Sequence, residues 1–288
     1  MMRRDVKVAR WVLSAPLLAF LAVAVAYPLL YGIRTALQHR TLLDPVATWA
    51  GLDNLSHVVR DAGFWHAVLF TLQFTVIVTL VELVLGFALA LLMEKAFPGR
   101  RGLLSVLILP VMIAPALMGV MFRLLLNQDI GFVPALLHKV GLDITLFSNG
   151  AVVPLLTVLD IAQWTPFTFL LFYSGLQTVP RELYEAATVD GASYLRTVQS
   201  IVVPLMLPIV FITGFLRAID GYRTFDVIYV LTGGGPADKT TTLSIYIYKA
   251  FATGNFGTAS AAALLAALIV LPLVPFVVKR IVTTEPGA

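Results

Sequence analysis

The sequence predicts an all-α integral membrane protein with six transmembrane helices. Hydrophobic residues make up 59% of the 288 residues and charged residues only 12%, about half the share of roughly 25% that soluble domains carry. Apolar runs of about 20 residues recur along the chain, and a helix of that length spans the hydrocarbon core of a bilayer. We therefore expect residues 1–288 to form a single transmembrane domain.

The apolar segments follow one another in chain order, and their ends are defined to within a few residues. The predicted spans are about 11–33, 66–93, 103–126, 151–176, 202–222 and 257–278. Several spans contain proline, for example Pro110, Pro115 and Pro208. Each proline frees a backbone carbonyl that must find a partner in a neighbouring helix, because lipid offers none. The helices are therefore expected to be kinked and packed as a bundle.

Basic residues set the orientation, because short cytoplasmic loops carry an excess of Lys and Arg. Four short segments are basic, and six spans put all of them on one side: the N-terminus, the 94–102 loop with Lys95, Arg100 and Arg101, the segment 180–203, and the tail with Lys279 and Arg280. The longer and more thinly charged loops fall on the other side. We therefore predict a multi-pass protein with both termini in the cytoplasm.

The first span also resembles a secretory signal peptide, with a basic start, an apolar run and Ala24-Val25-Ala26 as a cleavage site. The apolar run, however, continues through Tyr27-Pro28-Leu29-Leu30-Tyr31 without a polar break. Cleavage would also leave five spans and a conflicting charge balance. We therefore expect this segment to be retained as the first span.

Residues for thiol and metal chemistry are scarce. Cysteine is absent, which excludes a disulfide framework, a thiol nucleophile and a Cys-based metal site. The histidines fall in or near the first loops without a second histidine at i+3 or i+4, the spacing that a helical metal site needs; they are His39, His57, His66 and His138. No metal site is predicted.

A polar insert, residues 180–203, interrupts the apolar pattern between the fourth and fifth spans. Pro180 suits the first position of a helix, and Glu182 and Glu185 favour its N-terminal turn. The predicted helix Arg181–Val189 then meets Asp190-Gly191, where glycine can adopt the left-handed conformation that ends a helix.

A second helix is predicted after this turn, with Ser193 as its N-cap. Tyr194, Leu195, Val198 and Ile201 recur as an apolar stripe. An amphipathic surface helix can rest on lipid, but such helices usually have a lysine-rich polar face. Here acids and bases are mixed, and small residues surround the turn, which favours the docking of a partner protein.

The motif Glu185-Ala186-Ala187, Asp190-Gly191-Ala192, Ile201 and Pro204 resembles the EAA motif of permeases of binding-protein-dependent ABC importers. In that family the motif forms coupling helices that fit a cleft on a cytoplasmic ATPase subunit. The resemblance implies ATPase coupling by the following residues: Glu182, Glu185, Ala186, Ala187, Asp190, Gly191, Ala192, Leu195, Ile201 and Pro204.

Two further stretches resemble the sugar-importer branch of that family, the maltose and glycerol-phosphate type. They are FDVIYVLTGGGPADKTTTLSIYIYKAF (225–251) and QWTPFTFLLFYSGLQTVPRELYEAA (163–187). The resemblance implies a subunit of the bacterial or archaeal inner membrane that forms half of the path for a sugar or a related polyol. It would work by alternating access, driven by ATP hydrolysis.

The resemblance also implies partners and cofactors. The partners would be a second homologous permease, two ATPase subunits that use ATP and Mg, and an extracytoplasmic substrate-binding protein. The binding protein would dock near the outer loop with Gly233, Gly234, Gly235 and Pro236. This chain itself is expected to bind no cofactor and no nucleic acid.

The chain is not expected to be an enzyme. No G-x-x-x-x-G-K-[ST] phosphate loop occurs, and the glycines at 233–235 are not followed by the Lys-Ser or Lys-Thr pair that such a loop needs. No credible set of nucleophile, histidine and acid is present either. ATP hydrolysis is therefore expected in a separate chain.

Polar residues inside spans are costly in lipid and usually face the bundle interior or a cavity. A sugar needs hydrogen-bonding groups for its hydroxyls and an aromatic ring to stack on. We therefore predict that the substrate path is lined by Asp160, Gln163, Trp164, Arg217 and Asp220. Two structural alternatives stay open: an intrahelical Arg217–Asp220 ion pair, and a packing contact for Glu82 in the second span.

The rival function is a secondary transporter driven by an ion gradient. That class is typically built from inverted repeats with broken helices and carries its coupling-ion sites near the midplane. No repeat is evident in this sequence, but Glu82 and Asp160 are candidate coupling acids. A third reading, a membrane scaffold or insertase, leaves the coupling motif unexplained.

Overall fold

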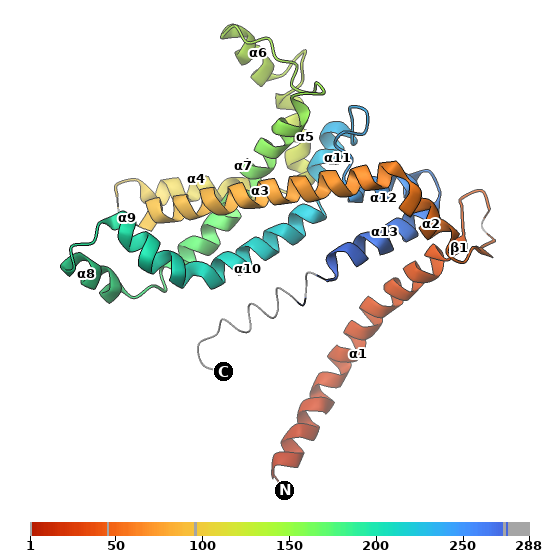
Figure 1. Cartoon of the computed structure of the whole chain (residues 1–288), viewed down its shortest axis with the longest axis horizontal. Helices are drawn as coiled ribbons and strands as arrows, with labels where there is room; N and C mark the ends of the chain where they lie inside the picture. The colour runs from red at the N-terminus through yellow and green to blue at the C-terminus, as the bar shows by residue number, and fades with distance from the viewer. Residues whose placement is uncertain (1, 45, 95–96, 273–274, 276–288) are drawn as a thin grey trace. The chain divides into compact units, whose positions relative to one another are not determined.

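A computed structural model describes residues 2–44, 46–94, 97–272 and 275, and these residues are almost entirely helical (Figure 1). The chain divides into two compact units. The first contains the chain up to Phe64 together with Ile247–Leu271, and the second contains Trp65–Tyr246.

The first unit combines the N-terminal part of the chain with Ile247–Leu271. Its elements are α1 (Met2–Ala36), β1 (Gln38–His39), β2 (Thr48–Trp49), α2 (Asp53–Arg60), the second part of α12 (Leu243–Ala252) and α13 (Phe256–Val270). α13 packs against α1 and α2. The buried Asn54 amide joins α2 to the end of α1 and to β1. Its Nδ2 donates to the carbonyl oxygens of Ala36 and Gln38, both at 2.9 Å.

The second unit contains the long apolar helices and the polar insert. Its elements are α3 (Ala62–Glu94), α4 (Arg100–Met112), α5 (Pro115–Leu125), α6 (Phe132–Lys139), α7 (Val152–Leu176), α8 (Arg181–Val189), α9 (Tyr194–Thr197), a π-helical turn (Val198–Val202), α10 (Val203–Tyr222) and α11 (Asp226–Thr232). Within this unit α7 packs against α4 and α10, and α5 packs against α11 (Figure 1).

Within the described residues, four helical runs are long and apolar enough to cross a membrane. They are Leu13–Ala36, Ala62–Glu94, Val152–Leu176 and Tyr194–Thr232. These runs match the first, second, fourth and fifth spans predicted from the sequence. The last run continues from the polar insert through the π-helical turn into α10, so the insert and the fifth span share one helical path.

The predicted third span, 103–126, is not one helix. α4 and α5 are bent by 98° at their junction and form one span only if the bent pair is counted together. The reason lies in Pro115, since a residue before proline is pushed out of the helical region; Ala114 accordingly has φ −58° and ψ 135°.

The sixth predicted span, 257–278, corresponds to α13, an apolar helix of 15 residues. That length is below the roughly 20 residues that span a bilayer. The end of this predicted span, together with Lys95, Lys279 and Arg280, lies outside the described residues.

Two apolar clusters form the core of the second unit. One joins α3, α7 and α11 through residues such as Phe74, Leu156 and Ile228. The other joins α3, α7 and the start of α10 through residues such as Phe169 and Met206. Along α3 the two clusters are separated at the level of Glu82, which is the position of the charged site described below.

Candidate functional site

The first helix of the polar insert forms as the sequence predicts, whereas the predicted second helix is the four-residue α9 followed by a π-helical turn. α8 begins at Arg181 and ends at Val189. Pro180 stands one position earlier than expected, as the N-cap with φ −59° and ψ 134°. Its extended backbone sets the direction in which α8 leaves α7.

The turn after α8 depends on Gly191, which has a left-handed backbone with φ +71°. The N–H of Ala192 donates to the carbonyl oxygen of Ala187 at 2.9 Å, and the N–H of Gly191 donates to that of Thr188 at 3.1 Å. These bonds satisfy carbonyls at the helix end. Ser193 then caps α9, because its hydroxyl oxygen accepts from the N–H of Arg196 at 3.4 Å.

Most residues of the motif lie on the surface of this helix pair. Exposed members are Glu182, Glu185, Ala186, Asp190, Gly191, Leu195 and Pro204. Ala187 is buried, and Ala192 and Ile201 are half-buried. Leu195 is 64% exposed and Val189, which is outside the motif, is 87% exposed. The segment therefore presents small, charged and apolar side chains together on one rigid turn.

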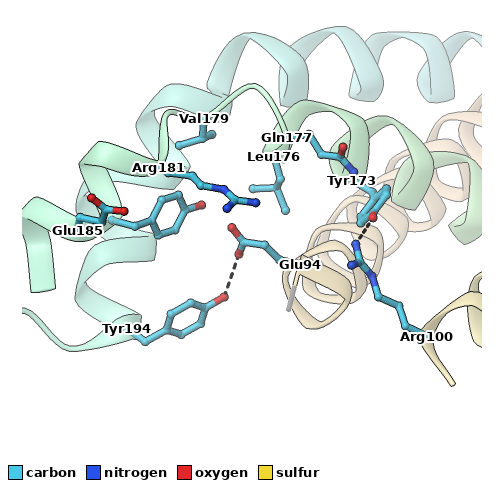
Figure 2. Close-up of a pocket in the computed structure, with 10 residues that line it drawn as sticks. Glu94, Arg100, Tyr173, Leu176, Gln177, Val179, Arg181, Glu185 and Tyr194 are labelled. Carbon is cyan, nitrogen blue, oxygen red and sulfur yellow. Dashed lines mark hydrogen bonds between the residues drawn. The ribbon is translucent and has the colours of Figure 1, made fainter. Parts of the chain in front are cut away.

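A pocket of about 650 Å³ lies behind this segment, between α8–α9 and the ends of α3, α4 and α7 (Figure 2). The side chains of Arg181 and Glu94 point into it from opposite walls. The Tyr194 hydroxyl donates to Glu94 Oε2 at a long 3.4 Å. Burial raises the pKa of Tyr184, and the nearby Glu94 carboxylate raises it further, so this phenol is protonated at neutral pH.

A second polar site is a charge network buried between α3, α7 and α10. Arg217 binds Glu82 through two nitrogens, Nε and Nη2, and the Nη2–Oε1 distance is 2.8 Å. Nη2 also donates to Asp160 Oδ1 at 3.0 Å. The three residues are only 0–7% exposed. A bidentate pair in an apolar environment is a strong interaction, so this network ties the three helices together.

Trp164 extends the network toward the surface. Its ring lies 4.9 Å from the guanidinium carbon of Arg217, within the range of a cation–π contact, and its side chain is half-buried. The neighbouring Gln163 is only 2% exposed, and its Oε1 has no hydrogen-bond partner among the described residues. A buried acceptor without a hydrogen bond is unusual in a folded protein.

The structure decides one alternative left open by the sequence. Arg217 does not pair with Asp220 within α10; Asp220 instead pairs with Arg223 at 3.1 Å. Glu82, which sequence reasoning left as a packing contact, is the main partner of Arg217. The signal was available: lone charges of opposite sign lie inside different spans, and each needs a partner in lipid.

α3 and α7 approach closely beside the network. A Cβ on Gly86 would lie 2.1 Å from Thr168 Oγ1 and 2.8 Å from the backbone nitrogen of Phe169. The same Thr168 hydroxyl donates to the carbonyl oxygen of Glu82 at 2.8 Å. Glycine at position 86 is therefore needed for the geometry that brings Glu82 to Asp160 and Arg217.

The glycine-rich loop predicted to meet a binding protein follows α11. Gly233 ends α11 with φ +60°, and Gly234 is buried, while Gly235 and Pro236 are half-buried. The exposed tip is formed by Ala237, Asp238 and Lys239.

Among the described residues, no group of three or more His, Asp or Glu side chains could hold a metal ion. His39 and His138 lie near single carboxylates, those of Asp53 and Asp143, at 3.8 and 3.7 Å.

Residues 82–283 match the family described as binding-protein-dependent transport system inner membrane component. The chain is 30% identical over 263 residues to the trehalose/maltose transport system permease protein MalF of Thermococcus litoralis, covering 91% of this chain and 89% of that protein. It is 31% identical over 281 residues to the trehalose transport system permease protein SugA of Mycobacterium tuberculosis, covering 96% and 90%.

A third relative is the sn-glycerol-3-phosphate transport system permease protein UgpA of Agrobacterium fabrum, at 29% identity over 276 residues and covering 94% and 93%. Among solved structures, the fold is similar to a chain of a bacterial ABC transporter involved in the import of the acidic polysaccharide alginate. The TM-score is 0.83 at 22% identity, with 99% of both chains covered.

Proposed function

The chain belongs to the family of binding-protein-dependent transport system inner membrane components, and we propose that it forms half of the translocation path for a sugar or a related polyol. As a member of this family it is a permease subunit of an ABC importer, a transport protein rather than an enzyme. The substrate class is supported by relatives at about 30% identity whose names refer to trehalose, maltose and glycerol 3-phosphate.

The proposed topology has six spans in one permease domain, residues 1–288, with both termini in the cytoplasm. The distribution of basic residues supports this orientation. The bent pair α4–α5 would provide the third span, and α13 with the residues after it would provide the sixth.

The proposed assembly contains a second homologous permease, two ATPase subunits and an extracytoplasmic substrate-binding protein. ATP and Mg would be used by the ATPases, because this sequence lacks a phosphate loop. The binding protein would dock on the outer side near Gly233, Gly234, Gly235 and Pro236, with the exposed tip 237–239 beside them.

The observation that carries the proposal is the exposed turn between α8 and α9. It presents Glu185, Ala186 and Asp190 to the surface, and its second helix continues directly into the fifth candidate span. A push on this turn would therefore move α10. Closure of the ATPases around ATP would move the coupling residues 182–204, and the bundle would switch between inward-open and outward-open states.

The substrate path is proposed along the face with Asp160, Gln163, Trp164, Arg217 and Asp220. Trp164 is the best placed for a sugar, since its side chain is half-exposed, and the buried Gln163 lies next to it in α7. Arg217 donates to both Glu82 and Asp160, so Asp160 and Arg217 would hold this face in position.

The experiment is to purify the chain from its native membrane in mild detergent and to identify what accompanies it. A Gly191→Trp variant is compared with Gly141→Trp, because Gly141 has a similar backbone (φ +79°) and equally open space around it. We expect an ATPase subunit and a second permease with the wild type and with Gly141→Trp, and loss of the ATPase alone with Gly191→Trp. A chain that purifies alone and transports sugar down an ion gradient would overturn the proposal.

A further inference from the structure

A second pocket, of about 540 Å³, lies at the start of α4 and carries net positive charge. It is lined by Phe97, Gly99, Arg100, Arg101, Leu104 and Tyr173. Two of these residues are arginines, and none is acidic. The pocket therefore differs from the one behind α8–α9, where Glu94 and Glu185 face the arginines.

The two arginines of this pocket form no ion pair with a carboxylate in the part of the chain that the structure describes. The Arg100 guanidinium lies over the Tyr173 ring at 5.4 Å and donates to the Tyr173 hydroxyl, as Figure 2 shows. A hydroxyl is not a carboxylate, so this hydrogen bond is not an ion pair. Arg100 Nε is shielded from solvent and has no hydrogen-bond partner among the described residues.

The helix itself adds to this positive field. α4 begins at Arg100, so both arginines stand in its first turn, and no acidic residue accompanies them there. Positive side chains at a helix N-terminus face the positive end of the helix dipole, which is unfavourable. A bound anion would remove this conflict by interacting with both guanidinium groups.

The surroundings indicate which anion. No residue of α4 is buried, and Val106, Leu109 and Met112 are 55–75% exposed along it, so this apolar helix would face lipid in a bilayer. The charge distribution puts its start at the cytoplasmic surface. Basic pockets between helices at this surface bind anionic lipid headgroups.

We propose that this pocket binds the phosphate of an anionic phospholipid. Arg100 and Arg101 hold the phosphate oxygens, and Phe97 and Leu104 contact the start of the acyl chains. Free phosphate offers the same charge, but it leaves the apolar wall uncovered. Because Arg100 and Tyr173 also line the pocket behind α8–α9, a bound lipid steadies the wall beside the coupling residues.

The test uses the intact transporter in mild detergent and native mass spectrometry with phosphatidylglycerol or phosphatidylcholine of matched acyl chains. The wild type should retain phosphatidylglycerol preferentially, even in excess inorganic phosphate. Arg101→Gln should lower this retention about fivefold, as expected for one arginine near a lipid surface, and Arg100→Gln should lower it at least as much. Arg196→Gln removes the same charge from the exposed surface of α9 and should change the retention of phosphatidylglycerol less than about twofold.

Equal retention of the two lipids, or an equal loss with Arg196→Gln, would overturn the proposal. Displacement of phosphatidylglycerol by inorganic phosphate would overturn it too, because the pocket would then prefer a free anion. The thermal unfolding of each purified variant in detergent serves as the folding control. Lipid retention is measured without transport, so its outcome is separate from that of the proposed function.

Discussion

The polar residues of this protein occupy two regions that satisfy their charges in different ways. In the α8–α9 segment, Glu182, Glu185 and Asp190 are exposed, and most hydrogen bonds are local ones that cap helices. In the network of Glu82, Asp160 and Arg217, every member is buried, and the bonds join α10 to α3 and to α7. We propose that the first region contacts a partner outside the chain, whereas the second region holds three helices of the chain together.

This difference has an energetic basis. Water screens the exposed charges, so individual surface pairs contribute only about 0–1 kcal/mol. A buried pair is not screened, and removing one partner leaves an uncompensated charge. Mutations in the network should therefore act on stability, while mutations in the α8–α9 segment should act on coupling.

The largest expected effect is that of Arg217→Met. This change leaves Glu82 and Asp160 buried without their cation and should destabilise the protein by about 3–5 kcal/mol, measured as thermal unfolding of the purified complex. Arg223→Met is the matched control, because the Arg223 side chain is 75% exposed and pairs only with Asp220 among the described carboxylates. Equal, small losses in both variants would contradict a structural role for the network.

The next largest effect is expected at the close approach of α3 and α7. Gly86→Ala puts a methyl group against Thr168 and the Phe169 backbone and should lower the free energy of unfolding by about 1–3 kcal/mol. Gly102→Ala meets nothing within 4 Å and should stabilise α4 by up to about 1 kcal/mol. If both variants unfold at the same temperature, the two helices do not touch as described.

The smallest effect on stability is expected at the turn between α8 and α9. Gly191→Ala meets open space but must keep φ +71°, which strains an alanine by about 1–2 kcal/mol. The visible consequence should be weaker stimulation of ATPase activity by the substrate-loaded binding protein. Gly191→Asn should lose less of this stimulation, because asparagine tolerates the left-handed conformation. Full stimulation of ATPase activity in Gly191→Ala would show that this turn is not needed for coupling.

The two regions also differ in how well the sequence predicts them. The ends of α8, the turn at Gly191 and the cap at Ser193 were predicted correctly, because each depends on residues within a few positions. The partner of Arg217 was not predicted, since Glu82 is 135 positions away and no spacing rule reaches that far. The pattern within one span shows which of its residues are polar, but it does not show which other helix packs against them.

The third span was predicted as one kinked helix, and, for a similar reason, the size of its bend was not predicted. Hydropathy over 103–126 reports how apolar the segment is, and the prolines in it predicted kinks. The 98° bend is larger than a kink and makes two helices of one apolar run. Its size depends on packing against neighbours, such as α5 against α11, which the local sequence does not contain.

The most direct test of the coupling role uses the absence of cysteine from the sequence. Ala186→Cys and Ala237→Cys each introduce a unique, exposed thiol into this chain. In the assembled transporter, this thiol is labelled with a short thiol-reactive photo-cross-linker. We predict that position 186 cross-links to the ATPase subunit. Position 237 should cross-link to the substrate-binding protein or to nothing. Cross-linking of position 237 to the ATPase, with position 186 labelled only from outside the cell, would contradict the central claim.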